Sequence, residues 1–251
     1  MTTYIFDGTK NGLFTCVFES FYKKENPDEV TDGNSQSGFF DINKTIITDE
    51  KKAERVSACL KRCKTKYLSS DVNYAFRSGD KNKFTVIFAY IKKAVENKQR
   101  DISTAFSLPE TLAFHDLKAR IQYETHRFKG FLRFMESEEG YFYACYEPDN
   151  DITDLLAPHF RDRLKSPFAI HDVKRNVIAL CDGKSIKTIS GAATGVTVFL
   201  SAEEEKMQEL WKSYYKSINI TERKNTRQMR AFLPERYWKH LSEKQENIGD
   251  F

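Results

Sequence analysis

The feature that most constrains the fold is a tight turn flanked by short β-prone runs. Residues 177–181 and 184–189 are apolar or alternate between apolar and polar, and Asp182-Gly183 lies between them. An Asp-Gly pair in this position favours a two-residue β-hairpin turn. Residues 168–173 form a further run of the same kind. The sequence therefore predicts neighbouring antiparallel strands in this region.

A second hairpin is predicted earlier in the chain, and helices separate the two. Residues 129–135 and 141–147 alternate around a Glu-Gly turn. Helical spacing of apolar residues predicts a helix from the capping box at Ser107 to about His126, and another over residues 152–163. A capping box at Ser201 opens a third helix, with an expected inward face of Met207, Leu210, Trp211, Tyr214 and Ile218. Residues 195–200 are a further strand candidate.

The first hundred residues are predicted to be mostly helical. Apolar residues recur at helical spacing in four segments, which are residues 12–24, 49–64, 71–78 and 81–96. Short strands are predicted at 3–7 and 43–48, and the polar, glycine-containing stretch 28–41 is predicted to be a loop. We expect one family domain over residues 1–251, with a soft internal boundary near 97–106 between a mainly helical part (1–106) and a part of alternating helices and hairpins (107–251). Because hairpins alternate with helices, the predicted class is α+β, with an antiparallel sheet covered by helices.

Composition limits the compartment and the cofactors. No run of about 18 apolar residues is present, and no signal-peptide pattern precedes the first strand, so neither a membrane span nor secretion is expected. The five cysteines are an odd set without framework spacing, which is typical of reduced thiols in a cytoplasmic protein. The chain has no phosphate-binding or dinucleotide glycine motif and no compact metal motif, so we expect no cofactor and no metal.

The stretch from residue 124 to 175 contains the candidate catalytic residues. Three of the five histidines lie here, beside arginine or aspartate. The candidates for proton transfer are Glu124, His126, His159, His171 and Asp172. Glu124 falls on a buried helix stripe and so needs a partner, for which Arg127 and Arg133 are the candidates.

Each of these residues also has a structural alternative. His126 could be a half-buried residue at a helix end, favoured there by the helix dipole. His159 and Arg163 could hold a phosphate or tie their helix to a neighbouring carboxylate. On a strand, His171 and Asp172 face opposite sides, so Asp172 would either orient another histidine or form a turn salt bridge with Lys174 or Arg175.

A basic segment near the C-terminus predicts contact with nucleic acid. The bases between residues 212 and 239 are Lys212, Lys216, Arg223, Lys224, Arg227, Arg230, Arg236 and Lys239. Aromatic residues that can stack on unpaired bases are interleaved with them. The candidate phosphate contacts over the whole chain are Arg127, Arg133, Arg163, Arg175, Arg223, Asn225 and Arg227. The alternative is an ordinary solvated helix face with its aromatics in the core.

Several phrases along the chain occur together in a known family. They include residues 4–8 (Tyr-Ile-Phe-Asp-Gly), 124–127 (Glu-Thr-His-Arg), 147–150 (Glu-Pro-Asp-Asn), 171–175 (His-Asp-Val-Lys-Arg) and 233–238 (Leu-Pro-Glu-Arg-Tyr-Trp). The set resembles a bacterial family described as "probable DNA metabolism protein", built on the domain of unknown function 4130. The resemblance implies a genomic neighbour, a putative DNA modification or repair radical SAM protein. In some bacteria the domain is fused to a uracil-DNA glycosylase-like domain, and we expect this chain to be the stand-alone form.

Three functions remain open from the sequence. The first is an accessory protein of DNA modification or repair that binds DNA, a radical SAM partner, or both. The second is an enzyme that acts on nucleic acid, as a hydrolase or a base- or nucleotide-modifying enzyme, through a cleft of His, Asp and Arg. The third is a structural partner subunit without its own activity.

Overall fold

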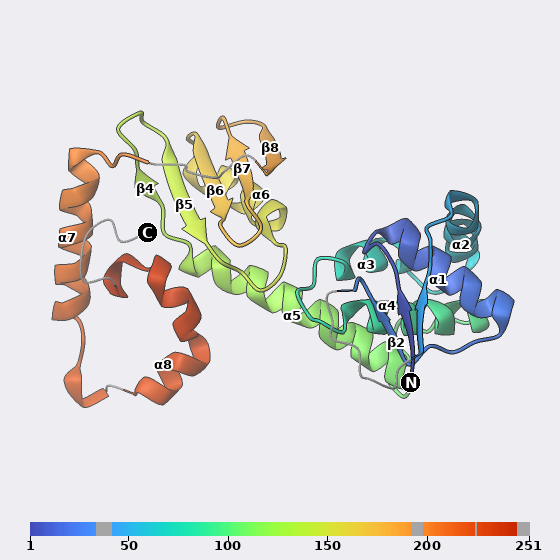
Figure 1. Ribbon diagram of the computed structural model, residues 1–251. Helices are drawn as coiled ribbons and strands as arrows, with labels where there is room; N and C mark the ends of the chain where they lie inside the picture. The colour runs from blue at the N-terminus through green and yellow to red at the C-terminus, as the bar shows by residue number, and fades with distance from the viewer. Residues whose placement is uncertain (34–41, 192–197, 224, 245–251) are drawn as a thin grey trace. The chain divides into compact units, whose positions relative to one another are not determined.

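The computed structural model describes residues 1–33, 42–191, 198–223 and 225–244, and its contacts divide the chain into two compact units (Figure 1). The first unit is Met1–Gln122 and the second is Tyr123–Phe251. The boundary expected near 97–106 falls inside the first unit. No helix among the described residues has the length and apolar content needed to cross a membrane.

The first unit contains a small parallel sheet. Strand β1 (Thr2–Ile5) lies between β2 (Glu29–Thr31) and β3 (Ile42–Thr45) and pairs in parallel with both. The prediction of a loop over 28–41 is therefore wrong at β2. That strand has three residues, too few for an alternating pattern to show in the sequence. Residues 34–41 lie outside the described part.

Helices make up most of the rest of this unit, as predicted. They are α1 (Lys10–Lys23), α2 (Glu50–Arg62), α3 (Leu68–Ala75) and α4 (Lys83–Glu96). Thr9 and Asp49 cap α1 and α2, because their side chains accept the amide protons of Gly12 and Lys52. The core between them is rich in aromatic rings, and Tyr90 stacks on Phe114 with ring centroids 3.9 Å apart.

The helix α5 (Pro109–Phe131) is longer than the sequence suggested. It was expected to end near His126 and to be followed by a strand over 129–135. Its buried stripe instead continues through Ile121 and Phe128 to Leu132, so helical spacing persists to the end of the segment. The expected first hairpin is consequently reduced to β4 (Met135–Glu136), a two-residue strand paired with β5 (Phe142–Tyr146).

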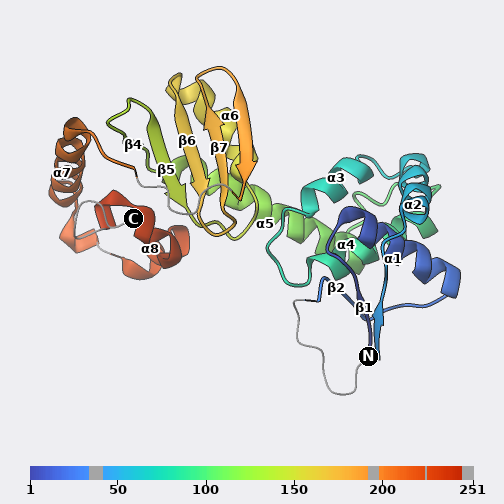
Figure 2. The ribbon, with the colours of Figure 1, turned by 45° about the horizontal axis from the view of Figure 1, so that its top comes forward.

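The second unit is built on a five-stranded sheet in the order β4-β5-β6-β7-β8 (Figure 2). Strands β6 (Phe168–Asp172), β7 (Val177–Cys181) and β8 (Ile186–Ser190) are antiparallel neighbours, as predicted. The pair β5–β6 is parallel, because helix α6 (Thr153–Leu164) crosses over between them. The α+β class is confirmed, and the sheet is mixed rather than wholly antiparallel.

The hairpin between β7 and β8 is present, but its turn lies one residue later than predicted: the Asp182 amide donates to the Ser185 carbonyl at 3.3 Å, so Gly183 and Lys184 are the two central residues. Gly183 has a φ of +92°, which favours glycine. The Asp182 carboxylate accepts the backbone amides of Lys184 at 2.8 Å and Ser185 at 2.7 Å. These charge-assisted bonds lower the pKa of Asp182 to about 2. The turn therefore fixes the β7–β8 register.

The C-terminal segment forms a chain of helices. They are α7 (Ala202–Ser217), η1 (Thr221–Arg223), α8 (Thr226–Phe232), η2 (Glu235–His240) and η3 (Ser242–Lys244). Ser201 caps α7 by accepting the Glu204 amide at 3.1 Å, while the Glu204 carboxylate accepts the amide of Glu136. Only Leu200 of the expected 195–200 strand forms a bridge, to Ser137, and residues 192–197 lie outside the described part.

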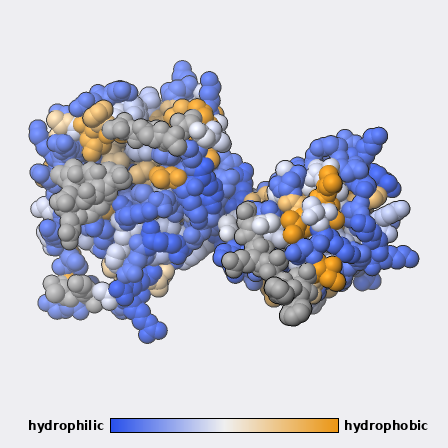
Figure 3. All heavy atoms as spheres, viewed as in Figure 1, coloured by the Kyte–Doolittle hydropathy of each residue, from blue (hydrophilic) through white to orange (hydrophobic). Residues whose placement is uncertain are grey.

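The expected inward face of α7 is exposed, which corrects the sequence prediction. The five apolar residues of that face are 41–63% exposed. The helix contacts β4 and η3, Trp211 donates to Glu243 of η3, and Gln208 is the buried residue of the helix. Figure 3 shows apolar side chains at the surface of both units within a mainly hydrophilic exterior. The helix is thus amphipathic, but most of its apolar stripe is exposed.

Substitution by alanine is expected to have opposite effects on stability at two helical glycines. A Cβ at Gly12 in α1 would lie 2.2 Å from Asp7 Oδ1, which is already fixed by bonds from the Thr9 amide and hydroxyl. A Cβ at Gly130 in α5 would meet nothing within 4 Å. We expect Gly12→Ala to lower the free energy of unfolding by more than about 1 kcal/mol. Gly130→Ala should raise it by roughly 0.5–1 kcal/mol. Urea unfolding of both variants tests this, and equal effects would contradict it.

Candidate nucleic-acid interface

The buried Glu124 carboxylate is the centre of the polar network in the second unit. Its Oε1 accepts the Asp149 amide and the Tyr237 hydroxyl, both at 2.7 Å. Its Oε2 accepts the backbone amide of Asn150 at 2.8 Å and the Asn150 side-chain amide at 2.6 Å. Four donors occupy the lone pairs of the carboxylate. Glu124 is therefore an anchor for the 147–150 loop, and its oxygens are already engaged as acceptors.

The arginines expected to pair with Glu124 have other partners. Arg127 donates to the Tyr123 hydroxyl and the Ala231 carbonyl, both at 2.8 Å. Arg133 forms a bidentate pair with Glu243, with bonds of 2.8 Å and 3.3 Å. The predicted Arg–Glu124 contact is wrong, because the donors to Glu124 come from backbone amides and a tyrosine that are distant in sequence.

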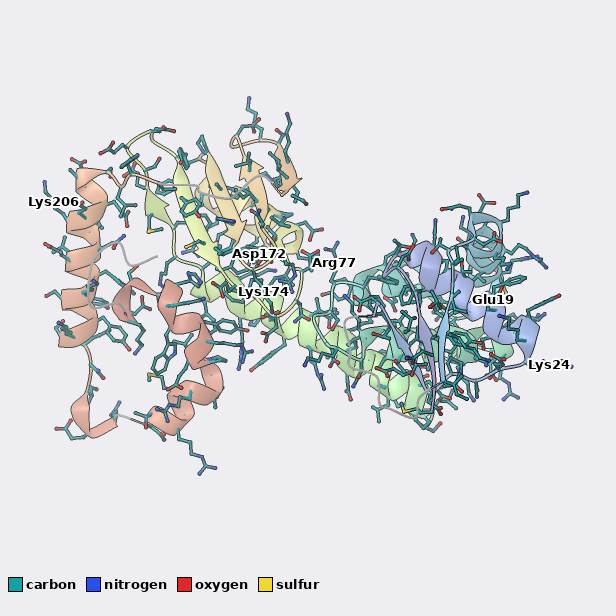
Figure 4. The ribbon with its side chains drawn as sticks, viewed as in Figure 1. Glu19, Lys24, Arg77, Asp172, Lys174 and Lys206 are labelled. Carbon is teal, nitrogen blue, oxygen red and sulfur yellow. The ribbon has the colours of Figure 1, made fainter. Side chains whose placement is uncertain are left out.

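Asp172 and Arg175 form a second anchor for the same loop. Asp172 is fully buried, and its carboxylate accepts Arg175 Nη1 at 2.8 Å and the Arg175 amide at 3.1 Å. Burial raises the pKa of Asp172, against the opposing effect of Arg175. Arg175 also donates to the carbonyls of Pro148 and Asp149. Asp172 thus pairs with Arg175, the structural alternative, and Figure 4 labels it beside Lys174 in the second unit.

The three candidate histidines occupy separate environments. His126 is exposed on α5, and His159 is half-buried on α6, where burial, Lys129 and Arg163 lower its pKa. His171 is buried on β6, where its Nδ1 lies 2.7 Å from the Tyr143 hydroxyl and burial lowers its pKa. His171 and Asp172 have different partners on opposite sides of the strand, as their alternation predicts. Among the described residues no three His, Cys, Asp or Glu gather as a set of metal ligands.

A fourth histidine, His240, was missed in the sequence. Its Nδ1 lies 3.5 Å from Cys145 Sγ, and its Nε2 lies 3.8 Å from Glu147. Burial raises the pKa of Cys145 to about 11, and burial together with Lys239 lowers that of His240. At neutral pH the pair is therefore a thiol beside a neutral imidazole, which is not an activated nucleophile. No sequence signal pointed to this contact, since 95 residues separate its members.

The basic C-terminal segment divides into paired and unpaired cations. Arg230 pairs with Glu235 and Arg236 with Asp149, each at 2.6 Å, and Lys239 pairs with Glu147. Within the described ranges neither Arg223 nor Arg227 forms an ion pair, and both side chains are exposed. Arg236 and Lys239 therefore attach the segment to the 147–150 loop after β5, Arg230 pairs within the segment, and Arg223 and Arg227 face solvent.

A cavity of about 420 Å³ lies beside the unpaired cations. Its lining residues come from the end of α7, from η1, from α8 and from η3, and they are Tyr215, Asn219, Arg223, Asn225, Thr226, Gln228, Met229, Phe232 and Lys244. The cavity combines two cations, amide side chains and two aromatic rings. Such a combination suits an anionic ligand that also presents a flat ring.

Local structure explains how the cavity is held open. Lys244 donates to the Tyr215 hydroxyl at 3.0 Å, and its ammonium lies 5.1 Å from the Tyr215 ring centroid and 5.0 Å from that of Trp238. Asn225 caps α8 by accepting the Gln228 amide at 2.9 Å. Phe232 is 62% exposed. A cation and an aromatic ring are thus fixed on one wall, and a second ring is accessible.

The predicted phosphate contacts are distributed unevenly around this cavity. Arg223 and Asn225 line it, and the exposed Arg227 follows on α8. Arg127, Arg133 and Arg175 are engaged in internal hydrogen bonds, and Arg163 is exposed on α6. Tyr215, Phe232 and Lys244 complete the lining. The sequence signal for the aromatics was their interleaving with bases, whereas nothing local marked Lys244.

Comparison of the sequence with known protein families assigns the chain to one of them. A family model described as a domain of unknown function, DUF4130, matches residues 81–243. Since the match covers more than half of the chain, this protein belongs to the DUF4130 family. No curated protein and no solved structure shows a significant match. The matched region includes the Glu124 network and every lining residue of the C-terminal cavity except Lys244.

The Glu124 network predicts a large loss of stability from a nearly isosteric substitution. In Glu124→Gln an amide NH₂ would face groups that are themselves donors. We expect the free energy of unfolding to fall by roughly 2–4 kcal/mol, because buried donors lose their acceptor. Tyr237→Phe removes a single bond and should cost about 1 kcal/mol. Denaturant unfolding measures both, and an unaltered Glu124→Gln midpoint would contradict this role.

The Arg133–Glu243 pair predicts an acid-sensitive contact. Although burial opposes it, the Arg133 bonds lower the pKa of Glu243, and the Trp211 indole donates to the same carboxylate at 3.1 Å. A lowered folded-state pKa means that the stabilisation is present above the usual glutamate pKa and is lost as pH falls through the lower value. In a Trp238→Phe background, Trp211 emission should change below about pH 4.5. Adding Glu243→Gln should remove that transition, and its persistence would contradict the assignment.

Proposed function

We propose that this protein is an accessory factor of DNA modification or repair that binds single-stranded nucleic acid at its C-terminal cavity. The observation that carries the proposal is the juxtaposition of Arg223 and Lys244 with Tyr215 and Phe232 around one cavity. Cations neutralise phosphates, and aromatic rings stack on unpaired bases without requiring a particular sequence. The DNA context comes from the family resemblance, which also suggests a radical SAM protein as the partner.

The paired and unpaired cations support a binding role over a merely solvated surface. A basic helix face that served only solubility would need no cavity beside it. Here Arg223 lines the cavity and Arg227 follows four residues later in α8, while neighbouring bases are neutralised by Glu235, Asp149 and Glu147. Uncompensated cations therefore remain beside the accessible aromatic rings. This arrangement favours an anionic ligand at that place.

The enzyme hypothesis has less support from the same geometry. Glu124 and Asp172, the carboxylates expected to move protons, accept internal donors. His171 is bonded to Tyr143, and His126 is exposed on another element. A general base needs an open lone pair within reach of substrate. We therefore favour binding over turnover by these residues.

Binding to a fluorescent oligothymidylate tests the proposal in the absence of any partner. We expect the affinity to fall as the salt concentration rises. The slope of log association constant against log salt concentration should decrease in magnitude by about 0.7 for each phosphate contact removed. Arg223→Glu with Arg227→Glu should weaken binding roughly tenfold or more and flatten the slope. Phe232→Ala should cost about 1–3 kcal/mol of binding free energy without altering the slope.

Lys206→Glu is the matched control for charge. Lys206 is exposed near the start of α7, nine residues before Tyr215 and so roughly 13 Å along the helix axis from it (Figure 4). Its reversal changes the net charge as each arginine reversal does, but it should leave most of the affinity intact. If the control weakens binding as much as Arg223→Glu, or if the cavity variants bind normally, the cavity is not the site.

A further inference from the structure

An apolar groove lies on the first unit, between helices α1 and α2. Its volume is about 510 Å³. The lining residues are Val17, Phe18, Phe21 and Tyr22 of α1, Arg55, Val56, Ala58, Cys59 and Arg62 of α2, and Val95 of α4. On each helix they recur at spacings of three or four residues, so the groove runs between two helical ridges.

The aromatic wall of this groove is ordered yet exposed. Phe18 and Tyr22 are stacked with centroids 6.2 Å apart, and Arg55 lies 4.9 Å above the Phe18 ring. Tyr22 is 77% exposed and Phe21 is 39% exposed. Large rings held in place at the surface lose little conformational entropy when a partner covers them. The wall is therefore prepared for an apolar contact.

The charge at the groove is of one sign. Arg55 and Arg62 are the charged members of its lining, and both are exposed. Arg62 donates a hydrogen bond from its Nε to the Ala58 carbonyl oxygen at 3.2 Å. The nearby carboxylate of Glu19 is bound by Lys52 at 2.6 Å and Lys23 at 3.0 Å. An occupant with apolar side chains flanked by carboxylates would match both the walls and the rim.

We propose that this groove docks an acidic amphipathic helix of a partner protein. A helix fits a groove between two helices by inserting apolar side chains at i, i+3, i+4 and i+7, and its flanking carboxylates would reach Arg55 and Arg62. A second copy of the chain is disfavoured, since a two-fold interface sets the same patch against itself and would oppose the four arginines. A small ligand is also a poorer fit, because pockets for small ligands enclose them with several placed polar groups.

Two synthetic 18-residue peptides provide the probe. They share a Leu and Phe face at helical spacing, and they differ only in a polar face of Glu or of Lys. Fluorescence anisotropy with the full chain should show saturable binding of the acidic peptide and at least tenfold weaker binding of the basic one. Equal affinities of the two peptides would overturn the proposal. So would the absence of saturable binding of the acidic peptide up to roughly 1 mM, a Kd that corresponds to a binding free energy of about −4 kcal/mol.

Variants assign the binding to the groove. Ala58→Trp fills the groove and should weaken acidic-peptide binding at least tenfold, and Arg55→Glu with Arg62→Glu should reverse the charge preference of the peptides. Lys61→Glu, exposed on the same helix but outside the lining, should change affinity little. Arg223→Glu with Arg227→Glu in the second unit should also leave it unchanged.

Three results would contradict the assignment. The first is acidic-peptide affinity that survives Ala58→Trp in a protein whose circular dichroism spectrum is unchanged. The second is loss of that affinity in the Arg223→Glu, Arg227→Glu variant, which would place the peptide on the C-terminal surface. The third is a concentration-dependent dimer, seen by sedimentation, that Ala58→Trp abolishes, because a second copy would then occupy the groove.

Discussion

The second unit depends on one buried carboxylate. Glu124 projects from α5 and accepts donors from the loop after β5 and from Tyr237 in η2, 25 to 113 residues away. The burial of a charge is unfavourable unless it is compensated, so these donors are required wherever Glu124 is buried. Tyr237 remains a donor because burial and the Glu124 bond raise the pKa of its hydroxyl. One side chain thereby joins helix, sheet loop and C-terminal segment.

The same constraint separates cations that are paired within the fold from cations that are not. Arg133, Arg175 and Arg236 are bound to carboxylates that belong to the fold. Their charge is neutralised locally, and they order the loop and the last helices. Arg223 and Lys244 lie at the cavity that this ordering creates. Within the basic segment, Arg236 is thus paired with Asp149, whereas Arg223 is exposed at the cavity.

Local features were predictable from the sequence, and long-range ones were not. The Asp182-Gly183 hairpin and the helices α2, α4 and α6 were predicted because turn chemistry and helical spacing are contained within a few residues. The three-residue β2 strand is too short to show a pattern. The parallel pairing of β5 with β6 also escaped prediction, because it depends on which strand a crossover helix returns to.

The candidate site was predictable to the same extent. Arg223 was chosen because bases and aromatics alternate near it, and it lines the cavity together with the other candidate, Asn225. The arginine partner predicted for Glu124 was wrong, since the donors to its carboxylate include backbone amides and a distant tyrosine. The inward face predicted for α7 was wrong as well, because periodicity indicates an apolar stripe and not what covers it. His240 carried no signal, since its contact with Cys145 exists only after folding.

The contact between His240 and Cys145 also gives the molecule a built-in reporter. Cys145 lies on a buried strand beneath η2, and its high pKa keeps the thiol protonated and unreactive. A reagent that modifies thiolates can reach it only when the C-terminal segment lifts from the sheet. The rate of modification at this position would therefore measure the local opening equilibrium of the segment that carries the cavity, separately from global unfolding. A thiol with no evident chemical role thus records the dynamics of the surface proposed to bind nucleic acid.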